Sequence, residues 1–244
     1  MLFDPRDFSV TDTIRCGSEL RRIIDRSPSI EDAAQGITGF LHRSLVADGE
    51  PACALVRCYK THPFGELPPD LQGFARNALK RKPDSPRLTC LTLLGTTGSR
   101  PEWNTRLRSI GHQAIPLENE QMIEQAPMVS QLIRQFGLDP KSVITPTPQI
   151  LQQDDGRSYG VFYVPRAVGS PYIPAQQDFV IRDGIQSVIG FGGLLRTGDM
   201  IAVILFSRVA IPEETAKRFR TLALDVRAAM FSAGHIATFK TRGE

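Results

Sequence analysis

The 244-residue chain lacks any apolar run that approaches the roughly 20 residues needed to cross a bilayer. Residues 1–7, Met-Leu-Phe-Asp-Pro-Arg-Asp, also lack the uninterrupted apolar core of a signal peptide. From these two absences we expect a cytoplasmic protein, or the cytoplasmic part of a larger one, with no membrane partner.

Charge of one sign is not in excess. The 29 lysines and arginines are nearly matched by 26 aspartates and glutamates, and the formal net charge is only +3. Proteins that bind nucleic acid usually gather basic residues on one face or along one helix. We therefore expect no nucleic-acid partner.

Cysteine is scarce, with four residues in the whole chain. Cys53 and Cys58 lie five positions apart, an odd spacing that predicts opposite faces of a strand. Cys53, Cys58 and Cys90 all fall in apolar runs, which predicts buried, reduced thiols. The four histidines have no second histidine or acidic residue at metal-ligand spacing, so we expect no protein-bound metal. The sequence requires no cofactor.

Catalytic and nucleotide-binding motifs are also missing. The chain has no Gly-Lys-Ser or Gly-Lys-Thr of a phosphate loop, no His-Glu-x-x-His and no Gly-x-Ser-x-Gly. Gly190-Phe191-Gly192-Gly193 lacks the full dinucleotide fingerprint and leads into a strand rather than a helix. We expect a module without catalysis of its own, whose output domain lies elsewhere.

The stretch from 184 to 231 is the most informative part of the sequence. Residues 185–192 and 200–208 are two apolar runs joined by a polar connector with Gly198-Asp199, which predicts an antiparallel hairpin. Pro212 is followed by two glutamates and predicts the start of a helix that reaches residue 231.

Other apolar runs predict further strands and one long helix. The strands are expected at 52–60, 88–95 and 160–164, and an amphipathic helix at 29–46 begins behind the capping residue Ser29. Since consecutive strands tend to lie side by side, we expect an α+β fold with one antiparallel sheet of five or six strands. Helices 29–46 and 213–231 are expected to cover one of its faces.

A helix that leads into the first long strand, and a terminal hairpin with a closing helix, together resemble the two ends of a GAF domain. A diverged PAS-type fold shares much of this pattern. Trp103-Asn104, residues 111–117 and Gly190-Phe191-Gly192-Gly193 are similar to a variant GAF-type sensor domain, which stands at the N-terminus of bacterial signalling proteins such as histidine kinases.

This resemblance implies a domain organisation. Residues 1–28 would form an N-terminal helix or linker, and residues 29–231 a single GAF-like domain. Within that domain, 96–180 would be a long irregular insertion, and residues 232–244 would form a C-terminal tail or linker.

The resemblance also implies a function. We expect a ligand-sensing or regulatory module of bacterial signal transduction, which binds an unknown small molecule and passes a signal through its terminal helices to an output kinase or cyclase domain. A homodimer through the helices at 11–26 and 213–231 is expected. Two alternatives stay open. One is a redox enzyme that uses cysteine, because a reductase of free methionine sulfoxide also has the GAF fold. The other is a dimerisation module without a ligand.

Candidate ligand contacts lie in the long loops, which bring aromatic and polar side chains together. We expect the site between the sheet and these loops, with Trp103, Arg108, His112 and Tyr172 as contacts. Arg106 and Arg108 favour a ligand with negative charge or carbonyl acceptors. Two alternatives apply to these residues: Trp103 and Phe179 as a small core beneath the loops, and His112 as a haem ligand.

Overall fold

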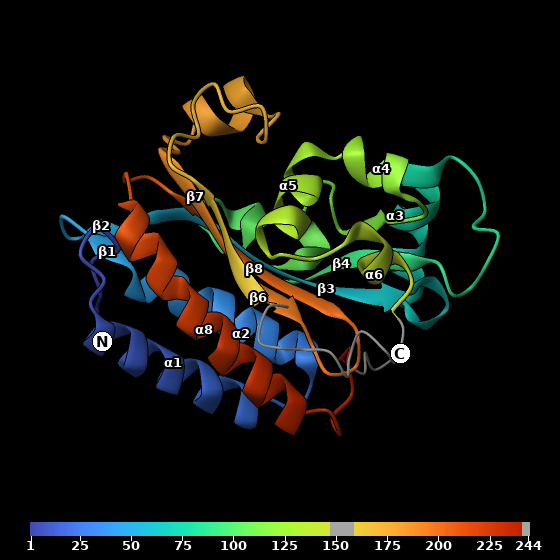
Figure 1. Ribbon diagram of the computed structural model, residues 1–244, viewed down its shortest axis with the longest axis horizontal. Helices are drawn as coiled ribbons and strands as arrows, with labels where there is room; N and C mark the ends of the chain where they lie inside the picture. The colour runs from blue at the N-terminus through green and yellow to red at the C-terminus, as the bar shows by residue number, and fades with distance from the viewer. Residues whose placement is uncertain (147–158, 241–244) are drawn as a thin grey trace.

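The computed structural model describes residues 1–146 and 159–240 (Figure 1). Residues 147–158 of the expected insertion and residues 241–244 of the expected tail lie outside the described part of the chain. None of the helices in that part is long and apolar enough to span a membrane.

A six-stranded antiparallel sheet forms the centre of the molecule, with the strand order β5-β4-β3-β8-β7-β6. The strands are β3 (Cys53–Pro63), β4 (Thr89–Gly98), β5 (Ala114–Pro116), β6 (Tyr159–Val164), β7 (Ser187–Leu194) and β8 (Met200–Ser207). The expected α+β class and antiparallel sheet are confirmed. The short edge strand β5 is the one strand of this sheet that the apolar pattern did not predict. A separate two-residue hairpin pairs β1 (Val46–Ala47) with β2 (Glu50–Pro51).

Three helices cover one face of the sheet, as Figure 1 shows: α1 (Val10–Asp25), α2 (Ile30–Ser44) and α8 (Glu213–Ser232). Ser9 and Ser29 cap the first two, since each hydroxyl accepts a hydrogen bond from a backbone N–H of the first turn. The expected helices 29–46 and 213–231 therefore cover one face, and α1 joins them. Their apolar sides form one buried core with the sheet.

The opposite face carries shorter elements. The helices α4 (Glu120–Glu124), α5 (Pro127–Gln135) and α6 (Pro140–Ile144) pack in a second core, and α3 (Pro69–Leu79) belongs to a third. Short helical segments lie in other connections of the chain: η1 (Phe64–Glu66) before α3, η2 (Pro101–Trp103) and η3 (Arg106–Arg108) between β4 and β5, and the π-helical η4 (Gln176–Ile181) between β6 and β7. α4 ends at Glu124 and α5 begins at Pro127, which cannot donate the backbone hydrogen bond that would continue the first helix.

One expectation about the cysteines is wrong. Cys53 and Cys58 lie on the same face of β3, packed in the helix-covered core, rather than on opposite faces. The pairing of β3 with β8 skips Ala54, since Cys53 pairs with Ser207 and Leu55 with Phe206. Ala54 is the extra residue of a β-bulge, which shifts the in-and-out alternation of side chains by one position. Two residues an odd number of positions apart, Cys53 and Cys58, therefore lie on the same face.

The segment after α8 returns to the beginning of α2. The backbone N–H groups of Ile30 and Glu31 each donate 2.9 Å hydrogen bonds, to the carbonyl oxygens of Ala237 and Thr238. A helix leaves its first N–H groups without partners inside the helix, so this C-terminal segment satisfies two of them. Residues 236–240 are therefore docked on the domain.

Candidate functional site

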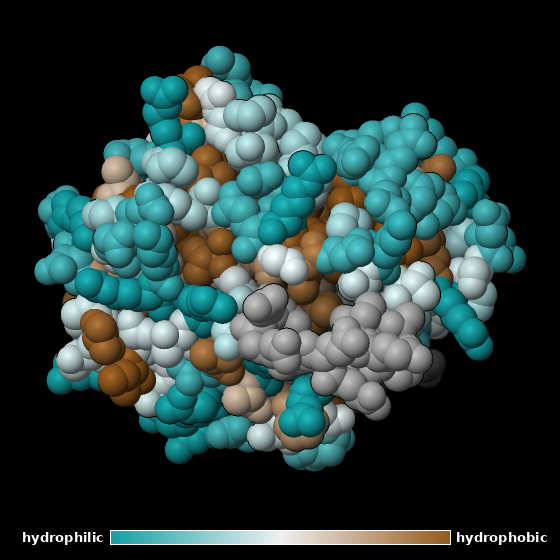
Figure 2. Space-filling view, in the orientation of Figure 1, coloured by the Kyte–Doolittle hydropathy of each residue, from teal (hydrophilic) through white to brown (hydrophobic). Residues whose placement is uncertain are grey.

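A cavity of about 550 Å³ lies between the sheet and the elements on its less covered face. Its floor comes from the sheet: Leu55, Arg57, Tyr59, Leu91, Ile115, Ala202, Ile204 and Phe206. Its walls come from the first turns of α5, from the loop around η2 and from residues 173–182. Figure 2 shows a notch in the surface between the 165–186 segment and the α3–α5 region, with apolar surface at its base.

Most of the cavity lining is apolar, and a few ionisable side chains are placed within it: Arg57, Arg100, Glu102, His112, Asp178 and Arg182. This mixture of an apolar wall with a small number of polar groups is typical of small-molecule sites, whose volumes run from about 300 to 1,000 Å³.

Arg57 is a half-buried cation on the floor, in the middle of β3. Its Nη1 donates to the Tyr59 hydroxyl and its Nη2 to the Ser109 hydroxyl, each at 3.1 Å. Its Nε is buried and has no hydrogen-bond partner among the described residues. No carboxylate oxygen of the described chain lies within 4.0 Å of this guanidinium group, so its charge is not balanced by an ion pair.

An aromatic cluster forms one wall. The Trp103 ring meets Phe179 edge-on at 5.7 Å between centroids, and Phe179 meets Phe206 of β8 at 4.9 Å. Arg100 stacks over Trp103 at 4.6 Å and forms an ion pair with Asp183 at 2.6 Å. Trp103 and Phe179 therefore belong to the second core and also form part of the cavity wall.

The structure brings two of the four expected contact residues to this cavity. Trp103 and His112 line it, whereas Arg108 and Tyr172 do not. Arg108 is exposed, and Tyr172 packs beside the second core. His112 has a left-handed backbone, with a φ of 54°. Desolvation, and then the nearby Arg57 charge, lower the pKa of the His112 imidazole.

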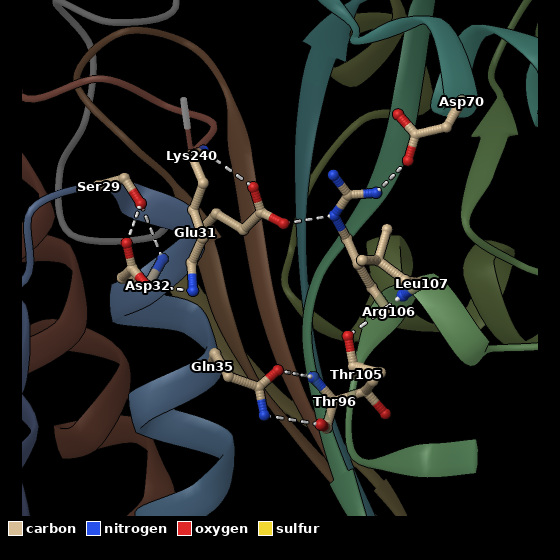
Figure 3. Close-up of polar contacts among 10 residues, drawn as sticks. All are labelled: Ser29, Glu31, Asp32, Gln35, Asp70, Thr96, Thr105, Arg106, Leu107 and Lys240. Atoms are coloured by element: carbon tan, nitrogen blue, oxygen red, sulfur yellow. Dashed lines mark hydrogen bonds and ion pairs between the residues drawn. The ribbon is translucent and has the colours of Figure 1, made fainter. Parts of the chain in front are cut away.

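Arg106, the other cation expected to face a ligand, does not line the cavity and instead belongs to a buried ion-pair network (Figure 3). Its Nε lies 2.6 Å from Glu31 of α2, and its Nη1 lies 2.7 Å from Asp70 of α3. The second Glu31 oxygen accepts the backbone N–H of Lys240 at 3.0 Å. Arg106 thus joins the η3 loop to α2 and α3, and Glu31 joins this network to the C-terminal segment.

Two further polar loop residues stabilise the loops themselves. The Asn104 side chain bonds the backbone of Gly98 and Arg100. The Gln176 amide donates to three carbonyls of the 167–173 turn and accepts from Gly169. Their side chains hold the cavity walls in place.

The cysteines lie away from the cavity, and none of them lines it. Cys16, Cys53 and Cys58 are buried in the helix-covered core, and Cys90 in the core beside α3. Burial raises the pKa of each of the four thiols to about 12.

Within residues 1–146 and 159–240, no three His, Cys, Asp or Glu side chains are placed to hold a metal ion.

Comparison with known proteins identifies the fold. No protein-family model and no curated protein matches this sequence. A free methionine-R-sulfoxide reductase from Neisseria meningitidis, solved with its substrate, is 10% identical with a TM-score of 0.51, and the match covers 92% of each chain. The GAF domain of a phosphoenolpyruvate-protein phosphotransferase from Coxiella burnetii is 10% identical with a TM-score of 0.51, over 93% of this chain and 96% of that one. The chain has a GAF-like fold.

Sequence reasoning missed Arg57, a cation on the floor of the cavity. The available signal is a single charged residue inside an otherwise apolar strand run, Ala52-Cys53-Ala54-Leu55-Val56-Arg57-Cys58-Tyr59. A charge at such a position needs a buried partner or an open cavity.

Proposed function

We propose that this GAF-like domain is a ligand-sensing module of signal transduction, which binds a small organic molecule between the sheet and α5. The observation that carries the proposal is the 550 Å³ cavity, with its apolar floor, aromatic wall and few polar groups. A domain whose ancestral pocket had filled with side chains would lack such a space.

The position of the cysteines favours this function over thiol-based redox chemistry. A redox-active cysteine needs a lowered pKa and access to its substrate. The four thiols here are buried, have raised pKa values and lie outside the cavity. The similarity to the reductase is therefore a similarity of fold.

Signal output is proposed to run through the Arg106 network. The loop at 103–112 supplies Trp103 and His112 to the cavity wall, and Arg106 lies between them in the sequence. Arg106 contacts Glu31, which also holds the backbone of Lys240. A ligand that shifts this loop would change the docking of residues 236–240, and so report to an output domain such as a kinase or cyclase.

A ligand screen by thermal denaturation tests the binding. A compound library should contain members that raise the melting temperature of the wild type but not that of Ala202→Leu, which places a larger side chain on the cavity floor. Ala78→Leu on the exposed side of α3 is the matched control, because Ala78 does not line the cavity, and it should respond as the wild type does. A library without any stabilising compound, or equal responses in all three proteins, would contradict the proposal.

Hydrogen exchange tests the output. For a compound that binds, exchange of the backbone amides in residues 236–240 should change on binding in the wild type. The change should be lost in Glu31→Gln, which weakens the contact to Arg106 and Lys240. Unchanged exchange in the wild type would show that the cavity and the C-terminal segment are not coupled.

We also propose that two copies associate through α1 and α8. Ile14 on α1 and Phe231 on α8 are large apolar side chains that remain exposed in the single chain. Light scattering at high micromolar concentration should show a dimer, and Ile14→Asp should shift it toward monomer. A wild type that stays monomeric would refute this.

A further inference from the structure

Arg57 occupies an unusual place for a charged residue. It comes from the middle of β3, a central strand of the sheet, where it pairs with Thr96 of β4 and Ile204 of β8. Val56 and Cys58 on either side of it are buried under the helices, and Arg57 points to the other face, onto the cavity floor.

The hydrogen bonds of this guanidinium are incomplete. Arginine presents five N–H donors, and the described residues accept two of them, through the neutral hydroxyls of Tyr59 and Ser109. Its Nε–H is buried without a partner. A cation held in a largely apolar site is stabilised by an opposite charge, and the described residues place none within ion-pair distance.

The other cavity cations differ from Arg57. Arg100 donates to both carboxylate oxygens of Asp183 and is thereby neutralised. Arg182 also lines the cavity, but its side chain is exposed. Asp178, four residues earlier in the sequence, is a cavity-lining carboxylate that is exposed as well. The half-buried Glu102 also lines the cavity, but forms no ion pair with Arg57. Arg57 is therefore the cation placed to receive an anion.

We infer that the occupant of the cavity is a small organic anion, whose carboxylate, sulfonate or phosphate group is bound by Arg57 while its apolar body packs against Trp103, Phe179 and Ile204. The inference rests on the proposed ligand-binding function and names the ligand class. Planar guanidinium groups bind such oxyanions through paired N–H donors.

Two dyes of nearly the same shape test the charge requirement. 8-Anilinonaphthalene-1-sulfonate has an apolar aromatic body with a sulfonate, and N-phenyl-1-naphthylamine has the same body without it. Trp103 is the only tryptophan of the chain and lies in the cavity wall. A dye bound in the cavity should therefore quench the Trp103 emission, with one dye per protein.

We expect the wild type to bind the sulfonate more tightly than the neutral dye. Arg57→Gln should weaken sulfonate binding by about 10- to 100-fold, the range for a lost hydrogen bond to a charged group. It should leave binding of the neutral dye nearly unchanged. Arg108→Gln is the matched control, because Arg108 is exposed and does not line the cavity, and it should bind both dyes as the wild type does.

The outcomes separate the two proposals. Quenching by the neutral dye alone would refute the anion requirement and leave the ligand-binding function standing. The anion requirement would also be refuted if a folded Arg57→Gln variant lost the same affinity for both dyes, or lost affinity for neither. No saturable quenching by either dye would count against both proposals. If Arg57→Gln does not fold, the wild type and Arg57→Lys are compared instead. The inference then requires that the wild type prefers the sulfonate dye and that this preference is weaker in Arg57→Lys.

Discussion

The Nε of Arg106 lies 2.6 Å from a carboxylate oxygen of Glu31, and the two side chains are only 3% and 8% exposed. Removal of one member of a buried ion pair leaves the other charge without compensation. Arg106→Ala should therefore lower the free energy of unfolding by about 3–5 kcal/mol. Urea denaturation measures this directly.

Arg108→Ala is the control for Arg106→Ala, because it removes an exposed arginine from the same helical turn. Its effect should stay within about 0.5 kcal/mol. Addition of Glu31→Gln to Arg106→Ala should recover part of the loss, since the uncompensated carboxylate is then gone. Similar stabilities for the two alanine variants would show that the buried pair does not stabilise the fold.

Gly95 of β4 lies at a close contact between the sheet and α2. A Cβ atom added at Gly95 would lie 2.4 Å from the backbone carbon and oxygen of Ala34. Because backbone atoms cannot move aside without displacing the helix, Gly95→Ala should destabilise the protein by about 1–3 kcal/mol.

Gly73→Ala is the opposite case. Gly73 lies inside α3, and nothing lies within 4 Å of an added Cβ. This change should stabilise the protein by about 0.5–1 kcal/mol, because alanine loses less backbone entropy in a helix. The melting temperatures of both variants and of the wild type measure these effects. A Gly95→Ala protein that is as stable as the wild type would contradict the close contact.

His62 should make the stability fall in mildly acidic solution. Burial lowers the pKa of this imidazole well below its ordinary value of 6.5, and the Lys60 charge lowers it further. Neither ring nitrogen has a hydrogen-bond partner among the described residues. Phe239 of the C-terminal segment packs against the imidazole ring, with 5.2 Å between the two ring centroids.

The sign of the effect follows from proton binding. Well above pH 6.5 His62 is neutral in both the folded and the unfolded states and contributes no pH dependence. Below that value the unfolded chain binds a proton that the folded protein does not, so stability falls by up to about 1.4 kcal/mol per pH unit. His62→Leu should show a shallower decline between pH 6.5 and about 5 than the wild type. Parallel stability profiles of the two proteins would contradict this.

The four cysteines should be unreactive in the folded protein. All four are buried, and burial raises the pKa of their thiols to about 12, so little thiolate forms near neutral pH. A chromogenic disulfide reagent should modify none of them rapidly in buffer and all of them in denaturant. A cysteine that reacts quickly in the native protein would favour the redox alternative.

Local sequence patterns were sufficient to predict most of the architecture. Strands at 185–192 and 200–208 could be located because each is an apolar run with a turn beside it, and both are strands in the structure. The bulge at Ala54 could not be predicted, because it exists only through the register between β3 and β8. This register decided the face on which Cys53 lies.

The candidate site was predicted in part. Trp103 and His112 could be selected because an aromatic and a histidine in a long loop are typical of binding sites, and both line the cavity. Arg106 was assigned to the ligand by the same reasoning, but its partners Glu31 and Asp70 lie 75 and 36 residues away in the sequence. No local pattern indicates such a pairing.

The sequence by itself determined most of the elements and their order, because helix caps, turn residues and apolar periodicity act over a few neighbouring positions. Only the tertiary structure decided which arginine is paired and which is left facing a cavity. The charge of Arg106 is balanced by carboxylates from two distant helices, while Arg57 emerges where the chain supplies no carboxylate within ion-pair distance among the described residues. That difference depends on contacts between distant segments, which form only when the sheet and its covering elements pack together.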